Sequence, residues 1–180
     1  IYEAPTIDGR KYSALARLIT EPYLLYVGSA YPHKNLSLLI ESHNILKKQW
    51  PDLKLVLVGR SDFFYQRLKK NVGGGRGVIF WGEATDGTLA SLYAHAEVYV
   101  SLSLAEGFNL SAVEAISFGC PVVASDLAVH REIFGPAALI GGGEAADYAT
   151  LISQALSRGR KNFTPLNNAA AVLGRFSWQL

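Results

Sequence analysis

Short apolar runs and longer amphipathic stretches alternate along the chain. The apolar runs cover Tyr23–Gly28, Leu53–Gly59, Val78–Trp81, Glu97–Leu102, Pro121–Ser125 and Ala137–Ile140. Most of them are apolar at nearly every position, which is typical of strands that are covered on both faces. We therefore predict six buried β-strands.

The stretches between these runs have apolar residues at helical spacing. They cover Leu36–Trp50, Phe63–Asn71, Thr88–Ala96, Leu110–Gly119, Ala145–Ser157 and, more weakly, Leu166–Phe176. Regular alternation of strands and helices indicates an α/β fold with a doubly wound, six-stranded parallel sheet. Such sheets bind ligands at the carboxyl ends of their strands, so the turns that follow the strands are where we expect the functional site.

The residues before Tyr23 show no clear periodicity. We interpret residues 1–22 as a linker remnant that leads into a single domain of residues 23–180. The first residue is Ile rather than Met, so we expect the chain to be a piece of a longer protein.

Composition narrows the class of protein. The net charge is only +2, which argues against a nucleic-acid-binding protein that depends on bulk positive charge. Cys120 is the single cysteine, so the chain has no internal disulfide and no cysteine-based zinc cluster. No apolar run approaches 18 residues and no leader pattern opens the chain, so we expect a protein of the cytoplasm. We also find no Asp-x-Asp pair and expect no metal site.

The first candidate motif is YVGSAYPHKNL, residues 26–36. A strand ends at Gly28, a short turn carries Lys34, and a helix begins directly afterwards. The free N–H groups at a helix start, together with one ammonium group, favour anion binding. The alternative is that Lys34 is solvated and Asn35 only caps the helix.

The second candidate motif is SLAEGFNLSAVEA, residues 103–115. A strand leads through a glycine turn into a helix, and the carboxylates of Glu106 and Glu114 would face the same crevice. Carboxylates accept hydrogen bonds from pairs of hydroxyl groups, as in ribose and other sugars. The alternative is a capping box in which Ser111 and Glu114 close the helix start and Glu106 is merely exposed.

The longer segment EGFNLSAVEAISFGCPVVASD, residues 106–126, resembles the E-x7-E segment of retaining GT-B glycosyltransferases of the group 1, family 4 type. The opening motif resembles the G-x-x-x-P-R-K-N-L of the same family. Weaker matches are VLVG at 56–59, LY at 92–93 with AEVYV at 96–100, and FSW at 176–178. The resemblance implies that the chain is the Rossmann-like C-terminal half of a GT-B fold, which binds the nucleotide-sugar donor.

The resemblance also implies a role for individual residues. Lys34 would pair with the diphosphate and stabilise the leaving nucleotide, and Glu106 would contact the transferred sugar; these two are the expected catalytic residues. Glu114 would accept hydrogen bonds from the ribose. The complete expected donor-binding set is Gly28, Ser29, Lys34, Arg60, Gly82, Glu83, Glu106, Gly107, Phe108, Asn109, Leu110 and Glu114. Gly82 and Glu83 would lie beside the base.

The sequence departs from the family pattern at several of these positions. Relatives carry an arginine at the position of Ser29 or of His33, and Arg60 is the expected substitute cation. Asn109 replaces a glycine, and asparagine tolerates a positive φ better than most residues if the turn requires one. Ser111 replaces a proline.

The activity implied is transfer of a hexose from a nucleotide-diphosphate sugar to an acceptor with retention of configuration, without metal or cofactor, in polysaccharide biosynthesis. The acceptor, a saccharide or lipid-linked molecule, would be bound by an N-terminal half that this chain lacks, so we expect the chain alone to be inactive. Peripheral contact with the inner face of a membrane is a further expectation. The alternatives are a nucleotide-sugar epimerase and a non-catalytic nucleotide-sugar-binding module. We expect His43, His95 and Cys120 to be structural, and favour the same role for His130 over a ligand contact.

Overall fold

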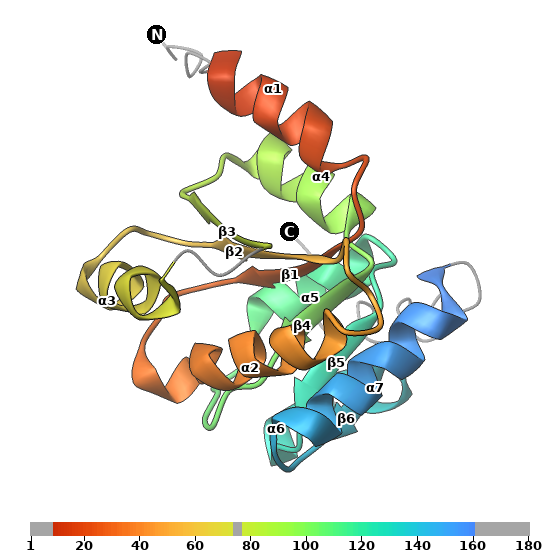
Figure 1. Cartoon of the computed structure of the whole chain (residues 1–180). Coiled ribbons are helices and arrows are strands. Elements are labelled where there is room, and N and C mark those ends of the chain that lie inside the picture. Colours follow the sequence, from red (N-terminus) through yellow and green to blue (C-terminus); the bar gives the residue numbers. More distant parts are fainter. Residues whose placement is uncertain (1–8, 74–76, 161–180) are drawn as a thin grey trace, which may run out of the picture.

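The computed structural model describes residues 9–73 and 77–160, and it contains a six-stranded sheet in the order β3-β2-β1-β4-β5-β6 (Figure 1). Every neighbouring pair of strands is parallel. The strands are β1 (Tyr23–Val27), β2 (Lys54–Val58), β3 (Val78–Gly82), β4 (Val98–Ser101), β5 (Val122–Ser125) and β6 (Ala138–Gly141). All six predicted strands and the doubly wound parallel sheet are therefore confirmed.

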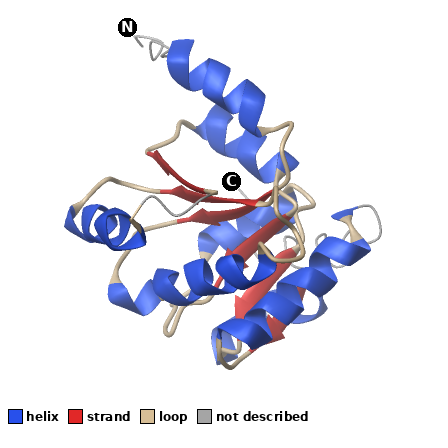
Figure 2. Ribbon diagram, viewed as in Figure 1, coloured by secondary structure: helices blue, strands red, loops and turns tan. Residues whose placement is uncertain are grey.

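Helices cover both faces of this sheet (Figure 2). They are α1 (Gly9–Leu18), α2 (Leu36–Leu46), α3 (Phe63–Val72), α4 (Asp86–His95), α5 (Leu110–Ser117), α6 (Ala128–Phe134) and α7 (Ala145–Arg158). One apolar core joins the sheet to α2, α3 and α7, and α2 lies directly against α7. A second core joins the opposite face to α1, α4, α5 and α6. The chain therefore has the three-layer arrangement that buried parallel strands require.

Two of the helices were not predicted. The sequence indicated no element before Tyr23, but Gly9–Leu18 forms α1, and Leu18 is 5 % exposed and packs in the core with Leu15. Helix α6 was missed because its seven residues are too few to show helical periodicity. The prediction of a helix over Leu166–Phe176 lies outside the described residues.

The strand order reverses between β1 and β4. Leu25 of β1 pairs with Tyr99 of β4, whereas β2 and β5 extend the sheet in opposite directions from this pair. The connections that leave β1 and β4 therefore run to opposite faces, and a crevice opens between the carboxyl ends of these two strands. This position brings the two sequence motifs together, because one follows β1 and the other follows β4.

Candidate functional site

A crevice of about 270 Å³ lies at the carboxyl ends of β1 and β4. Seven of the expected donor-binding residues line it: Gly28, Ser29, Lys34, Glu106, Phe108, Asn109 and Leu110. Its remaining lining residues are Tyr26, Val27, Tyr99, Ser101 and Ser111. The two motifs recognised in the sequence therefore form opposite walls of one crevice.

Lys34 and Glu106 form the charged centre of this crevice. Lys34 ends a short 3-10 helix, η1 (Pro32–Lys34), and its Nζ lies 2.8 Å from both carboxylate oxygens of Glu106. Ser103 donates a further hydrogen bond to Glu106 Oε1 at 2.7 Å. The side chains of Lys34 and Glu106 are only 19 % and 9 % exposed. Lys34 is therefore not simply solvated, and Glu106 is not merely exposed. The other part of the first alternative is confirmed, because Asn35 is the N-cap of α2.

The turn after β1 is held by tyrosine hydroxyl groups. Tyr26 donates to the carbonyl of Ser29 at 2.8 Å, and Tyr65 donates to the carbonyls of Gly28 at 3.1 Å and Val58 at 3.0 Å. Tyr65 has a single hydroxyl hydrogen, which the two carbonyls share. Burial raises the pKa values of both tyrosines, so they remain protonated donors. These hydrogen bonds therefore hold the backbone of Gly28 and Ser29, which lines the crevice, in one position.

Asn109 shapes the second wall. It has the left-handed backbone conformation, with φ 64°, and α5 begins at the next residue. The sequence anticipated this conformation as one that asparagine tolerates. The structure excludes the capping box, because the N-cap is Asn109 and Ser111 lies inside the helix.

Glu114 lies one helical turn beyond Ser111, on α5, and is exposed. Its Oε2 accepts a hydrogen bond of 2.9 Å from the hydroxyl of Tyr93 on α4. Burial, reinforced by the neighbouring Glu114 carboxylate, raises the pKa of Tyr93, so this hydroxyl remains a donor. Glu114 is thus held at the border of the crevice without lining it.

Four further expected residues also lie outside the crevice lining: Arg60, Gly82, Glu83 and Gly107. Arg60 is exposed and follows β2. Gly82 ends β3 with φ 82°, and the carbonyl of Glu83 accepts a hydrogen bond of 3.1 Å from Lys11 on α1. The crevice between β1 and β4 therefore does not include the positions expected for a second cation and for the base.

The sequence also missed several lining residues, among them Tyr26, Tyr99 and Ser101. They were assigned to buried strands on their apolar neighbours alone. Ser101 is the last residue of β4 and Tyr26 the last but one of β1, and this position could have identified them, since the carboxyl ends of strands at the switch point face the ligand. Tyr99 is the second residue of β4, and no sequence signal marks it as a lining residue.

Other expected features are structural. Cys120 is completely buried, and burial raises the pKa of its thiol to about 12, so it is no nucleophile. His43 is also fully buried and lies 3.0 Å from the Leu53 carbonyl.

Within residues 9–73 and 77–160, no group of three or more His, Cys, Asp and Glu side chains could hold a metal ion. No helix in the same part of the chain is long and apolar enough to cross a membrane.

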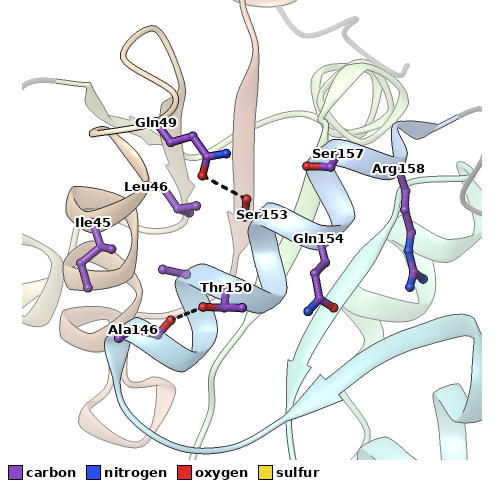
Figure 3. A pocket seen from close by; sticks show the side chains of 10 residues that line it. Ile45, Leu46, Gln49, Ala146, Thr150, Ser153, Gln154, Ser157 and Arg158 are labelled. Carbon is purple, nitrogen blue, oxygen red and sulfur yellow. Dashed lines mark hydrogen bonds between the residues drawn. The ribbon is translucent and has the colours of Figure 1, made fainter.

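A larger groove, of about 620 Å³, lies between α2 and α7 (Figure 3). Its walls carry small and polar side chains such as Gln49, Thr150 and Ser153, and Ser153 donates a long hydrogen bond of 3.4 Å to Gln49. None of the expected site residues lies in it. The smaller crevice at the strand ends is therefore the candidate functional site.

Comparison with known proteins gives a consistent result. The family model described as "Glycosyl transferases group 1" matches residues 14–170. The chain is 29 % identical over 172 residues to O-antigen chain mannosyltransferase B of Escherichia coli, covering 91 % of this chain and 44 % of that protein. It is 33 % identical over 134 residues to a phosphatidyl-myo-inositol mannosyltransferase of Mycolicibacterium smegmatis, covering 73 % and 32 % of the two chains. The chain thus spans less than half the length of these relatives.

Solved structures agree on the fold. A crystal structure of Anabaena HepE in complex with UDP and glucose superimposes with a TM-score of 0.75 at 23 % identity, covering 94 % of this chain and 48 % of that one. WaaG, a glycosyltransferase involved in lipopolysaccharide biosynthesis, superimposes with a TM-score of 0.72 at 18 % identity, covering 99 % and 49 %. The six-stranded domain therefore corresponds in fold to about half of each of these chains.

Proposed function

Because this chain belongs to the glycosyl transferases group 1 family, we propose that it binds the nucleotide-diphosphate sugar from which a hexose is transferred to an acceptor. The observation that carries the proposal is the Lys34–Glu106 pair at the switch point, where a cation and a carboxylate lie between two helix starts. A diphosphate needs the cation and the N–H groups, and a sugar needs the carboxylate.

Lys34 is the group that would bind the diphosphate. Its ammonium group can exchange the Glu106 carboxylate for phosphate oxygens, because both anions present the same kind of hydrogen-bond acceptor. The N–H groups at the start of α5 add to the positive field on the other wall. When the bond to the sugar breaks, the leaving nucleotide gains negative charge, and a fixed ammonium group stabilises that charge without a proton transfer.

Glu106 would then be released to face the sugar. Ser103 retains it through the 2.7 Å hydrogen bond to Oε1, so the carboxylate stays at the crevice when Lys34 turns to phosphate. The free oxygen can accept a hydrogen bond from a sugar hydroxyl or stabilise positive charge that develops on the sugar ring. In this proposal the Lys34–Glu106 ion pair exists in the ligand-free chain. On binding it separates, so that Lys34 contacts the diphosphate and Glu106 contacts the sugar.

The exposed Glu114 would accept hydrogen bonds from the ribose, with Tyr93 holding one of its oxygens. We expect Glu114→Ala to weaken the binding of UDP or GDP by about 10-fold, since a charged acceptor of two hydroxyl hydrogen bonds is lost at a partly solvated position. Isothermal titration calorimetry measures the loss.

Tyr93→Phe is the matched variant for this prediction. It removes the hydroxyl that orients Glu114 and leaves the carboxylate, so its effect on nucleotide affinity should be smaller than that of Glu114→Ala. If both variants lowered the midpoint of thermal unfolding equally and left nucleotide affinity intact, Glu114 would be a structural partner of Tyr93 rather than a ligand of ribose.

The substrate and setting are inferred from the relatives. Two of them are named as mannosyltransferases and one solved structure holds UDP and glucose, so we propose a hexose as the transferred group. We further propose transfer with retention, without a metal, to a saccharide or lipid-linked acceptor in cytoplasmic polysaccharide synthesis, with peripheral contact to the inner membrane face. The acceptor half would come from outside this chain, so the chain alone should be catalytically inactive.

Saturation-transfer NMR with UDP-glucose and GDP-mannose tests donor binding by this chain and distinguishes the proposal from the epimerase alternative. The proposal expects contact from the ribose and sugar protons of one nucleotide sugar, with no chemical change of that compound. An epimerase would produce a second sugar in the same sample. A chain that contacts none of the nucleotide sugars would contradict the proposal.

A further inference from the structure

A buried histidine, His130, contacts a residue that lines the crevice. His130 on α6 is completely inaccessible to solvent, and its ring stacks on Phe134 with 5.1 Å between ring centroids. Its Nδ1 lies 2.8 Å from the backbone carbonyl oxygen of Ser125, and its Nε2 lies 3.0 Å from Nδ2 of Asn109. His130 itself does not line the crevice.

These two contacts define one form of the His130 ring. A carbonyl oxygen can only accept a hydrogen bond, so Nδ1 carries the hydrogen. An amide nitrogen can only donate, so Nε2 must carry none. The structure therefore contains the neutral Nδ1–H tautomer of His130, and each nitrogen of the ring has a matching partner.

The contact of His130 decides which atom Asn109 offers to a ligand. The second hydrogen of Asn109 Nδ2 is directed to Ser101 Oγ, 3.0 Å away. Both N–H groups of the amide are thus used within the protein, one on Ser101, which also lines the crevice, and one on His130, which does not. Because Asn109 lines the crevice, the atom of its amide that remains for a ligand is Oδ1, a hydrogen-bond acceptor.

We propose that His130 is a positioning residue that keeps the Asn109 amide turned with Oδ1 toward the crevice, so that this position selects a ligand group that donates a hydrogen bond. The proposal rests on the proposed function, in which that group is a hydroxyl of the sugar carried by the nucleotide. A glycine at this position would allow the same left-handed turn but would present no acceptor.

Protonation of His130 would reverse this orientation. An Nε2–H group would face the Asn109 Nδ2, and two hydrogen-bond donors cannot pair, so the amide would have to turn its nitrogen toward the crevice. Burial lowers the pKa of His130, the hydrogen bond to the Ser125 carbonyl and the Glu106 carboxylate oppose that shift, and the Lys34 ammonium group adds to it. On α6 itself, Arg131 is paired with Asp126 at the surface. The acceptor orientation is therefore maintained at neutral pH.

The first test needs no ligand. Nitrogen-15 NMR of the histidine rings, with His130→Phe to assign the signals, should show the Nδ1–H tautomer for His130 at pH 7.5. It should also show a coupling across the hydrogen bond between His130 Nε2 and Asn109 Nδ2. An Nε2–H tautomer in the folded chain, or no coupling to Asn109, would overturn the proposal whether or not the chain binds nucleotides.

The second test compares the affinity for a nucleotide sugar with that for its nucleoside diphosphate, using UDP-glucose with UDP and GDP-mannose with GDP. The ratio that matters is the affinity for the nucleotide sugar divided by the affinity for its nucleoside diphosphate. For the pair that the chain binds, His130→Phe should lower this ratio by about 3- to 10-fold, which is the effect of one hydrogen bond. His130→Gln should retain the ratio, since its amide offers a donor group to the Ser125 carbonyl and an oxygen acceptor to the Asn109 N–H, as the neutral ring does. In an Asn109→Gly background, His130→Phe should have no further effect on the ratio.

His43→Phe is the control for the loss of a buried ring. His43 is equally buried and also contacts a backbone carbonyl, but it belongs to α2 on the other face of the sheet. The variant His43→Phe should leave the affinity ratio unchanged. An equal fall of the ratio in His43→Phe, or a further fall on adding His130→Phe to Asn109→Gly, would contradict the proposal. If the unmodified chain bound neither nucleotide, the proposed function would fail, and the NMR test would still decide the role of His130.

Discussion

Replacing Lys34 by methionine should reduce the affinity of the chain for UDP or GDP by about 30- to 150-fold. Lys34 is the cation at the centre of the crevice, and charge-assisted hydrogen bonds to phosphate contribute about 2–3 kcal/mol. Methionine keeps an unbranched apolar chain that is only one heavy atom shorter, so packing around η1 should change little. Isothermal titration calorimetry measures the affinity, and the thermal unfolding midpoint shows whether the variant is folded.

Glu106→Gln should have the opposite effect on the same ligand. In the structure the Lys34 ammonium group donates hydrogen bonds to the Glu106 carboxylate, and a diphosphate must displace this carboxylate. Glutamine is the same size but carries no charge, so it competes less for Lys34, and UDP or GDP should bind several-fold more tightly. A loss of affinity in Glu106→Gln similar to that in Lys34→Met would show that the intact ion pair, and not the free cation, forms the binding site.

Gly59→Ala should lower the free energy of unfolding by at least about 3 kcal/mol, because the neighbouring backbone cannot move aside without separating β1 from β2. A Cβ atom at residue 59 would lie 2.1 Å from the carbonyl oxygen of Gly28 and 2.7 Å from the ring of Tyr65. The backbone N–H of Gly28 also donates a hydrogen bond of 2.9 Å to the carbonyl of Val58, between β1 and β2. Chemical denaturation monitored by circular dichroism measures the change.

Gly87→Ala is the matched control for this prediction. Gly87 lies in the first turn of α4, and a Cβ there would meet nothing within 4 Å. Alanine favours helix over glycine, so this variant should be neutral or more stable by up to about 1 kcal/mol. If Gly59→Ala were as stable as Gly87→Ala, the close approach of the β1 and β2 turns would not be a constraint on the fold.

The sheet could be predicted because its signal is local. A strand that is buried on both faces must be apolar at nearly every position, and the runs such as Tyr23–Val27 and Lys54–Val58 satisfy this condition. Helix α1 could not be predicted in this way. Its sequence is amphipathic, with Leu15 and Leu18 on the face that contacts the core and mostly polar side chains elsewhere. Its signal is therefore a helical period, which the sequence analysis missed, and not a continuous apolar run.

The sequence predicted part of the crevice lining and none of its contacts, since seven of the expected residues line the crevice and five do not. Topology alone places the turns after β1 and β4 together, and the resemblance to a family pointed to Lys34, Glu106 and Asn109 within them. That Lys34 bonds to Glu106, 72 residues later, depends on rotamers and loop geometry that no sequence pattern reports. The contact between Asn109 and His130 is of the same kind, since α6 is too short to be recognised and its orientation follows from packing.

In the proposed function, this chain holds a nucleoside diphosphate through its own fixed charges. Titration calorimetry of the unmodified chain with UDP and with GDP, once in EDTA and once in Mg²⁺, tests it most directly. We expect one of the two nucleotides to bind with the same affinity in both buffers, because Lys34 and the helix N–H groups supply the positive field. Binding that appears only with Mg²⁺, or no binding of either nucleotide in both buffers, would contradict it.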